Sequence, residues 1–282
     1  MKIGIIVKPR LEAGEVLRSL LFYLRQRDVE IFLDPETAGL IGEPGSCPKS
    51  EIPSRVDLIA VLGGDGTLLS VARLIGARDV PIFGVNLGSL GFLTEVTLDE
   101  LYPTLDRVIA GEVDLDERIM LTASVIREGE KISSDSVLND IVINKSALAK
   151  IIDLAAYIDG KHIANFKADG LIVSTPTGST AYNLAAGGPI VQPGMHSIII
   201  NPICPHILTN RPVVVRDASE IEIVLKSENT EVHLTLDGQV GFSLRGEDVI
   251  RIVKADHTLR LISVPGKNYF DVLRTKLKWT ER

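Results

Sequence analysis

Aromatic residues, cysteines and long apolar runs are scarce in this sequence. Aromatic side chains make up 5% of the 282 residues, whereas 45% are hydrophobic and 24% charged, a balance typical of globular proteins. The two cysteines, Cys47 and Cys204, have the spacing of neither a disulfide framework nor a metal site, so we expect a reducing cytoplasm as the location. No run approaches the roughly 18 apolar residues of a membrane span, and the opening MKIGIIVKPR is too short for a signal peptide. The sequence therefore predicts a soluble, cytoplasmic protein that does not bind a membrane.

Positive charge is also lacking. The formal net charge is −7 and the isoelectric point is near 5.3, and the chain contains no Lys/Arg run of the kind that follows a phosphate backbone. We therefore expect no nucleic-acid partner, and an anionic ligand must be bound by a local site. The five histidines show no metal-ligand spacing, and neither a G-x-S-x-G elbow nor a Cys/His nucleophile site is present.

The chain divides into regions with different hydrophobic periods. Residues 1–117 alternate apolar runs such as KIGIIV, DLIAVLGG and PIFGVN with helical patterns such as EAGEVLRSLLFYLRQRD and TLLSVARLIG, and this predicts a parallel α/β domain. A Gly/Pro-rich loop is expected between the second and third strands, at 38–53. Residues 118–260 carry period-two runs such as LTASVIRE, IIDLAAYID, EIEIVLKSE, EVHLTLDG and LRLISV, which predict an antiparallel β-sandwich. Residues 261–282 include NYFDVLRTKLKW, a C-terminal helix that we expect to return to the first domain.

A glycine turn, GGDGT, joins an apolar strand to an amphipathic helix. Gly63, Gly64 and Gly66 leave the backbone bare, and Thr67 follows in the first turn of the helix. Such a turn offers unpaired N–H groups and the positive end of a helix dipole, which together bind anions. Asp65 could be a simple helix cap or a carboxylate aimed at a group that reacts with phosphate. The turn therefore predicts either a plain βα connection or a phosphate loop.

A second polar interruption occurs in VLNDIVINK. Asn139 and Asp140 place an amide and a carboxylate side by side in an apolar strand. The pair could form a turn or bulge, or it could clamp the hydroxyls of a ribose, as the acidic residue of dinucleotide folds does. Lys150 could be a solvated charge or a phosphate contact.

The most distinctive stretch is FKADGLIVSTPTGSTAYNLAAGGP. Five hydroxyl side chains fall within the seven residues 174–180, which is rich in hydrogen-bond donors for a simple loop. Tyr182 offers a ring or a hydroxyl to a ligand, and Asp169 stands at the head of the strand with Lys167 two residues earlier. The alternative is a capped helix after a strand, and STAYNLAAGG is the one short helix expected in this region. Two further turns, NLGSLGF and LDGQV, could line a site or be plain connections.

Together these motifs resemble the NAD kinase family, which makes NADP from NAD with ATP or polyphosphate. The resemblance runs through most of the chain and rests on GGDGTLL, GVNLGSLGFL, LNDIVI, DGLIVSTPTGSTAYNLAAGGP, ICPHILTNRPVVV and LDGQ. The first motif is shared with lipid kinases and phosphofructokinases, whereas STPTGSTAY is much more specific. The resemblance implies a Rossmann-like α/β domain followed by a β-sandwich domain.

The resemblance also implies roles for individual residues. Asp65 would act as the base toward the 2′-hydroxyl of the adenosine ribose, Asn139 and Asp140 would hold ribose hydroxyls, and Asp169 would meet the nicotinamide end, in some members across a subunit boundary. The residues implied to contact NAD are Asp65, Gly66, Phe92, Asn139, Asp140, Lys150, Lys167, Asp169, Thr177, Thr180, Ala181, Tyr182, Asn183, Leu184, Ala185 and Gln239. Gly63, Gly64, Gly66 and Thr67 would form the phosphate loop.

The implied reaction is the transfer of a phosphoryl group from ATP, or from another triphosphate or polyphosphate, to NAD. Mg²⁺ or another divalent cation would come with the nucleotide rather than from a protein-held site. The implied assembly is a homodimer or homotetramer. A lipid kinase of the diacylglycerol or sphingosine type and a non-catalytic NAD(H) sensor remain the alternatives.

Overall fold

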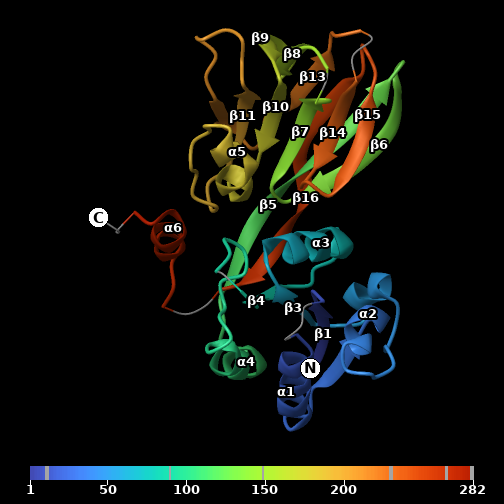
Figure 1. Ribbon diagram of the computed structural model, residues 1–282, viewed down its shortest axis with the longest axis vertical. Helices are drawn as coiled ribbons and strands as arrows, with labels where there is room; N and C mark the ends of the chain where they lie inside the picture. The colour runs from blue at the N-terminus through green and yellow to red at the C-terminus, as the bar shows by residue number, and fades with distance from the viewer. Residues whose placement is uncertain (10–12, 89, 148, 229–230, 264–265, 280–282) are drawn as a thin grey trace. The chain divides into compact units, whose positions relative to one another are not determined.

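The computed structural model describes residues 1–9, 13–88, 90–147, 149–228, 231–263 and 266–279 (Figure 1). The chain forms two compact units, of which unit 1 comprises Met1–Glu117 with Leu259–Arg282 and unit 2 comprises Arg118–Thr258. The sequence-based boundaries were 117/118 and 260/261. No helix in the described part of the chain has both the length and the apolar character needed to cross a membrane.

Unit 1 is a parallel α/β domain. Its strands follow the order β2-β1-β3-β4 with all neighbours parallel, and Leu261 near the end of β16 pairs in parallel with Ile82 of β4. The elements are β1 (Lys2–Val7), α1 (Ala13–Arg25), β2 (Glu30–Leu33), α2 (Pro35–Gly39), the 3₁₀ helix η1 (Lys49–Ser54), β3 (Leu58–Gly63), α3 (Asp65–Ile75), β4 (Ile82–Asn86), α4 (Leu101–Ala110), the end of β16 (Val249–Ile262) and α6 (Tyr269–Leu277).

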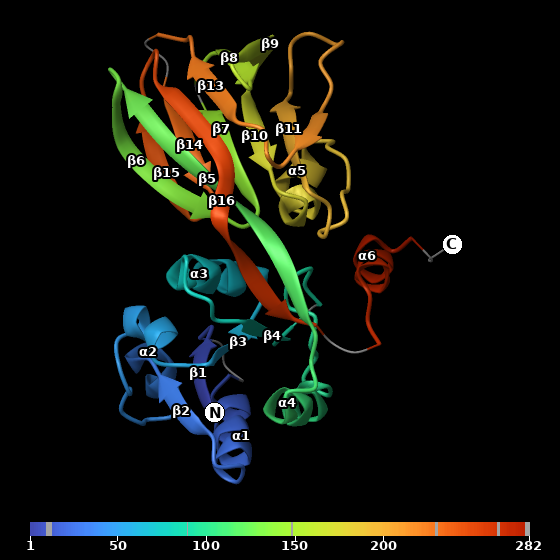
Figure 2. The same ribbon diagram turned by 180° about the vertical axis from the view of Figure 1, so that it is seen from behind.

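Strand alternation assigns the two faces of the unit 1 sheet to different helices. Ile3, Ile5 and Phe83 belong to one core cluster together with α1 and α4. Gly4 and Gly84 point the other way, where an added Cβ would meet Ile52 of η1 at 2.4 Å and Leu68 of α3 at 3.0 Å. Helices therefore cover both faces of the sheet, with α1 and α4 on one face and α3 on the other (Figures 1 and 2). This arrangement explains why the strands are apolar throughout.

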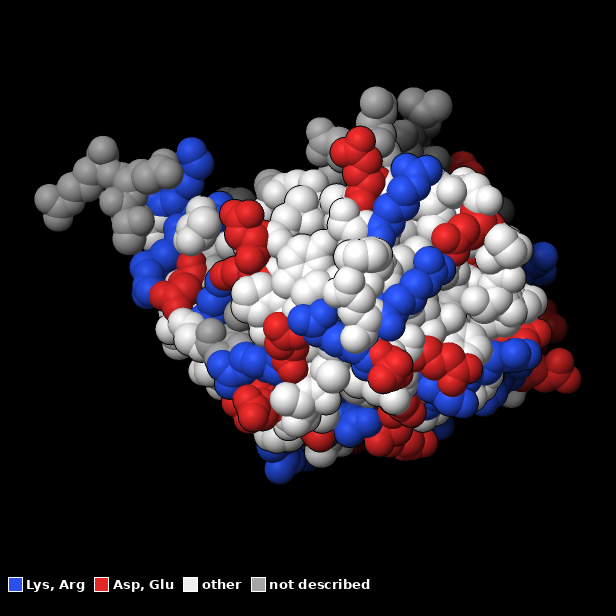
Figure 3. Space-filling model, turned by 90° about the horizontal axis from the view of Figure 1, so that it is seen from below, with Lys and Arg blue, Asp and Glu red and all other residues white. Residues whose placement is uncertain are grey.

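Charged side chains of both signs are mixed on the face that Figure 3 shows. Ion pairs in unit 1 include Arg27, just after α1, with Asp106 of α4 at 2.9 Å, and Arg25 of α1 with Glu43 at 3.0 Å. Among the residues drawn in colour on this face, positive charge forms no extended patch of the kind that binds a nucleic-acid backbone.

Unit 2 is a sandwich of two sheets. One has the order β16-β13-β8-β9 with β5 paired to β16 and β6 to β5, and the other is antiparallel with the order β12-β11-β10-β7-β14-β15. The elements are β5 (Leu115–Arg127), β6 (Glu130–Val137), β7 (Asp140–Lys145), β8 (Ile152–Ile158), β9 (Lys161–Ala168), β10 (Gly170–Ser174), the 3₁₀ helix η2 (Thr177–Thr180), α5 (Tyr182–Ala185), β11 (Ser197–Ile203), β12 (Val213–Arg216), β13 (Ile221–Leu225), β14 (Val232–Leu236), β15 (Val240–Leu244) and the first part of β16.

The two faces of the six-stranded sheet have different partners. Inward side chains such as Ile143, Leu171 and Ile200 form one large core with residues of the other sheet. Outward side chains of β7, β10 and β11 form a small cluster in which Val142 and Ile172 pack with Ala186, just after α5. The segment 177–186 therefore contacts the outer face of this sheet through Ala186.

The structure confirms the two fold classes predicted from the sequence and corrects some local predictions. The loop expected at 38–53 contains the end of α2 and the 3₁₀ helix η1, and α4 was not predicted. The short helix expected at STAYNLAAGG is present as η2 and α5, and the C-terminal helix as α6. Glu12 at the start of the first helical pattern, Ser89 of NLGSLGF and Val264 of LRLISV lie outside the described residues.

Candidate active site

The GGDGT turn connects β3 to α3 in unit 1. Gly64 is the N-cap of α3 with an extended backbone, and its carbonyl accepts the N–H groups of Thr67 and Leu68 at 2.9 and 3.2 Å. Gly63 requires the absence of a side chain, since a Cβ would lie 2.6 Å from Thr67 Oγ1, whereas an added Cβ at Gly64 or Gly66 meets nothing within 4 Å. The first glycine therefore permits the turn, and the other two leave open space beside the helix N-terminus.

Asp65 is the first residue of α3, and a neighbouring loop fixes its carboxylate. Oδ2 accepts the backbone N–H of Phe92 at 2.9 Å. Oδ1 accepts the backbone N–H groups of Leu93 and Thr94 at 3.1 Å each, and also the Thr94 hydroxyl at 3.1 Å. The partners of the carboxylate come from the loop after β4 and not from α3 itself, so Asp65 is not a simple cap of this helix.

The loop after β4 approaches Asp65 very closely. A Cβ on Gly91 would lie 2.0 Å from Asp65 Oδ1 and 2.4 Å from Thr94 Oγ1, so only glycine fits there. Thr94 is fully buried, and its hydroxyl also accepts the Nδ2 group of Asn86, the last residue of β4, at 3.2 Å. The Phe92 ring lies below Lys276 of α6, with Nζ 5.7 Å from the ring centroid. The GFLT segment of NLGSLGFLT is thus the backbone cradle of the carboxylate.

In unit 2, Asn139 and Asp140 lie where β7 begins. Asp237, in the turn between β14 and β15, accepts the backbone N–H groups of Leu138, Asn139 and Asp140 at 2.9, 2.8 and 3.1 Å. The backbone of Asp237 in turn donates to the Asp140 carbonyl at 3.0 Å. Asp237 has φ +51°, a left-handed conformation that aspartate tolerates. The LDGQ turn therefore holds the Asn139–Asp140 backbone in place.

Asp140 is buried next to a second carboxylate. Its side chain is 4% exposed, and burial, followed by the charge of Asp237, raises its pKa from 3.8 to about 7, against the opposing hydrogen bond from the Tyr182 backbone N–H. Asn139 is half-buried. The pKa of Asp140 is thus brought close to neutrality, and a ligand hydroxyl that donates to this carboxyl group would favour its ionised form.

The hydroxyl-rich run 174–180 largely bonds within the protein. Thr175 Oγ1 donates to the Leu138 carbonyl at 2.6 Å and accepts the Gly178 N–H at 3.0 Å, and Ser174 Oγ donates to the Asn139 carbonyl at 3.2 Å. Ser179 Oγ both donates to and accepts from the backbone of Val191 at 3.0 Å. These hydroxyls thus shape the turn and tie it to the Asn139 backbone, which differs from the sequence-based view that they are offered to a ligand.

The segment after this run is held by two buried asparagines. Asn183 Nδ2 donates to the carbonyls of Ser179 and Pro189 at 3.0 Å each, and its Oδ1 accepts Nδ2 of Asn201 on β11 at 3.1 Å. A Cβ on Gly188 would lie 2.0 Å from Asn183 Oδ1. Asn183 therefore fixes the path of residues 179–189.

The other predicted contact residues of unit 2 differ in accessibility. Thr177 is buried, and its Oγ1 lies 3.5 Å from Arg118 Nη1. Asp169 forms an ion pair with Lys145 of β7 at 3.5 Å, and Lys167 forms one with Asp153 of β8 at 3.8 Å. Lys167 and Asp169, which lie two residues apart in the sequence, therefore each pair with a residue of another strand. The residues that are exposed or half-buried are Lys150, Lys167, Asp169, Thr180, Ala181, Tyr182, Leu184, Ala185 and Gln239.

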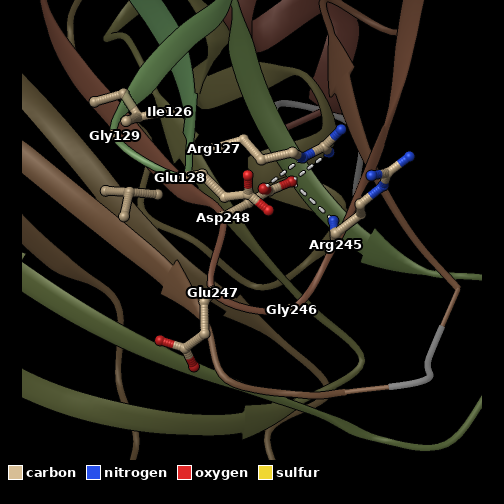
Figure 4. Close-up of a pocket in the computed structure, with 9 residues that line it drawn as sticks. Ile126, Arg127, Glu128, Gly129, Arg245, Gly246, Glu247 and Asp248 are labelled. Carbon is tan, nitrogen blue, oxygen red and sulfur yellow. Dashed lines mark hydrogen bonds and ion pairs between the residues drawn. The ribbon is translucent and has the colours of Figure 1, made fainter.

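A separate hollow of about 350 Å³ lies in unit 2 between the β5–β6 turn and the β15–β16 turn (Figure 4). Asp248 is at its centre with its side chain 1% exposed, and Arg127 donates to both of its oxygens at 2.8 and 2.7 Å. Arg245 adds its backbone N–H at 2.8 Å. Burial acts to raise the pKa of Asp248, but the hydrogen bonds from Arg127 and Arg245 outweigh it and the pKa is lowered. None of the predicted site residues lines this hollow, and Arg127 and Asp248, which do, are paired with each other.

Within the described ranges, no group of three or more His, Cys, Asp or Glu side chains could hold a metal ion. Mg²⁺ that arrives on nucleotide phosphates would need few protein ligands, because phosphate and water oxygens supply most of its coordination. Sequence reasoning singled out the NLGSLGF and LDGQV turns, which contain Asn86 and Asp237, but gave neither residue a role. It missed Thr94 and Asn201, for which the sequence pattern gave no signal.

Comparison with known proteins gives matches to both units. The family model of the ATP-NAD kinase N-terminal domain matches residues 3–113, and that of the ATP-NAD kinase C-terminal domain matches residues 138–264. The chain is 53% identical to an NAD kinase of Syntrophotalea carbinolica over 283 residues and 51% identical to one of Geobacter sulfurreducens over 284 residues. In both cases the match covers 100% of this chain and 99% of the relative.

Solved structures show the same fold. The yeast NADH kinase complexed with NADH superposes with a TM-score of 0.93 at 26% identity, covering 100% of this chain and 89% of that one. An NAD kinase from Archaeoglobus fulgidus in complex with ATP superposes with a TM-score of 0.80 at 26% identity, covering 99% of both chains. The matches favour the NAD kinase reading over the lipid kinase and the non-catalytic sensor. The chain belongs to the NAD kinase family and is an enzyme that phosphorylates NAD to NADP with ATP.

Proposed function

We propose that the phosphoryl group is transferred to the 2′-hydroxyl of the adenosine ribose of NAD and that Asp65 is the general base. The observation that carries this proposal is the anchoring of the Asp65 carboxylate by four donors from residues 92–94. Oδ1 accepts three of them and Oδ2 accepts one, so Oδ2 keeps a lone pair for an incoming hydroxyl proton. The carboxylate is held in one orientation before the substrate arrives, as a positioned base must be.

Phosphoryl transfer makes modest demands on such a base. Its transition state is loose, so the attacking hydroxyl needs orientation more than full deprotonation before attack. Mg²⁺ bound to ATP would neutralise charge on the phosphates. The bare backbone at Gly64 and Gly66, with open space beside it, lets phosphate approach the N-terminus of α3, where the helix dipole stabilises negative charge.

Unit 2 supplies the residues proposed to bind the dinucleotide. Asn139 and Asp140 hold ribose hydroxyls, with Asp140 accepting in its ionised form. Tyr182, which is 41% exposed, and its accessible neighbours line the adenine and nicotinamide side, while Asp169 lies toward the nicotinamide end. Asn183 is proposed to act by positioning this segment, because its side chain is buried and its hydrogen bonds stay within the protein. Lys150, Lys167, Thr177 and Gln239 remain predicted contacts.

The proposal extends to the donor, the assembly and the location. Polyphosphate is a further possible donor beside ATP, and a homodimer or homotetramer would place Asp169 at a subunit boundary. The location is cytoplasmic, supported by Cys47 and Cys204, both of which are free thiols.

Replacing Asp65 with asparagine tests the role of the base. Oδ1 must remain an acceptor for its three donors, so the new amide nitrogen is expected at the Oδ2 position, where it loses the hydrogen bond from the Phe92 N–H and cannot take a proton. We expect NAD to bind with a nearly unchanged dissociation constant while turnover falls by a factor of about 10² or more. Asp34→Asn is the matched control, because Asp34 Oδ1 likewise accepts backbone N–H groups, at the start of α2, and its Oδ2 likewise has one donor, the Thr37 hydroxyl. Near-normal turnover of Asp65→Asn would refute the proposal.

A further inference from the structure

We propose that Thr94, held by Asn86, is a positioning residue that selects Oδ2 of Asp65 as the oxygen that receives the proton. This inference rests on the proposed role of Asp65 as the base. Thr94 is 0% exposed and Asn86 is 5% exposed, so both side chains act inside the protein. Their hydrogen bonds form a directed chain from the end of β4 to the start of α3.

The direction of this chain is set by Asn86. Its Oδ1 accepts the backbone N–H of Gly88 at 2.6 Å, and a backbone N–H can only donate. The other end of the amide is therefore the Nδ2 group, which donates to Thr94 Oγ1 at 3.2 Å. A threonine hydroxyl has one proton. Because Oγ1 accepts from Asn86, that proton is directed to Asp65 Oδ1, 3.1 Å away.

The consequence for Asp65 is an asymmetric carboxylate. Oδ1 accepts the Thr94 hydroxyl in addition to the N–H groups of Leu93 and Thr94, which fills both of its lone-pair directions. Oδ2 accepts only the Phe92 N–H among the described residues, and one direction stays open. The Thr94 hydroxyl is the one side-chain donor in this set, so it is the contact that a point substitution can remove while the backbone contacts remain.

The local packing makes the effect specific to Asp65. The Cβ that Gly91 lacks would fall within 2.4 Å of both Asp65 Oδ1 and Thr94 Oγ1, so the loop is in direct contact with the carboxylate and with the hydroxyl. Loss of the hydroxyl would leave the carboxylate to its three backbone N–H donors and weaken the constraint on rotation about its Cβ–Cγ bond. A small misplacement of a positioned catalytic group can reduce the rate by a factor of about 10².

Thr94→Val removes the hydroxyl and keeps the shape of the side chain. We expect kcat to fall at least about 10-fold with the KM for NAD changed less than about 3-fold, because Thr94 does not touch the substrate. Thr94→Ser keeps the hydroxyl and should retain kcat within about 3-fold. Thr94→Cys, whose thiol is a weak donor, should lie between the two. The control is Thr104→Val, which removes the hydroxyl of another buried threonine of unit 1, one that donates to the carbonyl of Glu100, the N-cap of α4.

The deciding experiment is a double-mutant cycle measured as NADP formation by the full chain with NAD and MgATP. If Thr94 acts through Asp65, Thr94→Val should reduce kcat less than about 2-fold in an Asp65→Asn background, although it reduces it at least about 10-fold in the wild-type background. Equal reductions in both backgrounds, or a wild-type kcat for Thr94→Val, would overturn the inference. Near-normal kcat for Asp65→Asn itself would instead refute the proposed base. If Thr94→Val does not fold, the comparison of the Ser and Cys variants in the two backgrounds decides the question in the same way.

Discussion

Asp140→Asn is expected to stabilise the free protein at alkaline pH while weakening its binding of NAD. Asp140 is buried beside Asp237, and burial together with that charge raises its pKa to about 7. An asparagine has nearly the same shape and carries no charge at any pH. It therefore removes the cost of an ionised buried carboxylate but cannot act as the ionised acceptor proposed for a ribose hydroxyl.

The size of the stabilisation follows from the difference between the pKa of Asp140 in the folded protein and its pKa in the unfolded chain. The folded protein holds a proton on Asp140 up to a pKa of about 7, whereas the unfolded chain releases it near 3.8, so the folded state binds more protons between these values and stability falls as pH rises through this window. At about 1.4 kcal/mol per pKa unit, the penalty is roughly 2 kcal/mol at pH 5 and on the order of 4 kcal/mol at pH 8. It is absent well below pH 4 and constant above pH 8. Loss of a hydrogen bond to a charged group should weaken NAD binding by a factor of about 10 or more at pH 8.

The assay is urea unfolding of both proteins without NAD at pH 5 and pH 8, followed by far-UV circular dichroism. The gain in unfolding free energy of Asp140→Asn over the wild type should be larger at pH 8 than at pH 5 by about 2 kcal/mol. Asp135→Asn, at an exposed position of β6, provides the control, with no change in the difference between the two pH values. A pH-independent difference for Asp140→Asn would show that this carboxyl does not titrate as the structure requires.

Other substitutions in unit 2 have equally direct outcomes. Arg127→Met leaves the buried Asp248 without its two guanidinium hydrogen bonds and should lower the free energy of unfolding by about 3 kcal/mol, measured by urea unfolding, whereas Lys226→Met at the exposed pair with Glu247 should change it little. Because the pKa of Asp248 is lowered, this difference should be fully present above about pH 4 and shrink as pH falls further; a loss that is the same at pH 3 would contradict the ion-pair explanation. Gly178→Ala brings a Cβ to 2.2 Å from the Asn139 carbonyl and should reduce both stability and NAD affinity, while Gly194→Ala, with nothing within 4 Å, should do neither. Unchanged NAD affinity in Gly178→Ala would separate residues 174–180 from the ribose clamp.

Much of the fold could be predicted from hydrophobic periods. The parallel domain was predicted from the continuous apolar runs of β1, β3 and β4, because a strand buried on both faces is apolar throughout. The antiparallel domain was predicted from the alternating runs of β13 and β14, because a strand buried on one face alternates apolar and polar residues. The prediction missed α4, which has Pro103 in its first turn, where a missing N–H is tolerated. It also missed α2, although Asp34 caps it and Pro35 is its first residue, because the Gly/Pro content of the following residues dominated the interpretation.

The candidate site was harder to predict, because the partners of its polar groups are distant in sequence. Asp65 and the glycines were recognised from their motif, but the donors that hold the carboxylate come from residues 92–94 and only the structure brings them together. In the same way, Thr175 bonds to the Leu138 carbonyl, a partner 37 residues away. The sequence shows which hydroxyls exist but not which of them the fold already uses.

The central claim is tested most directly by the products formed from NAD and ATP. The purified chain would be incubated with Mg²⁺ and NAD, with ATP and polyphosphate in parallel, and the product would be detected with a dehydrogenase specific for NADP, which requires the phosphate on the 2′-oxygen of the adenosine ribose. The account predicts NADP in a one-to-one ratio with the ADP released. Release of ADP without NADP, at concentrations where NAD binds, would contradict it.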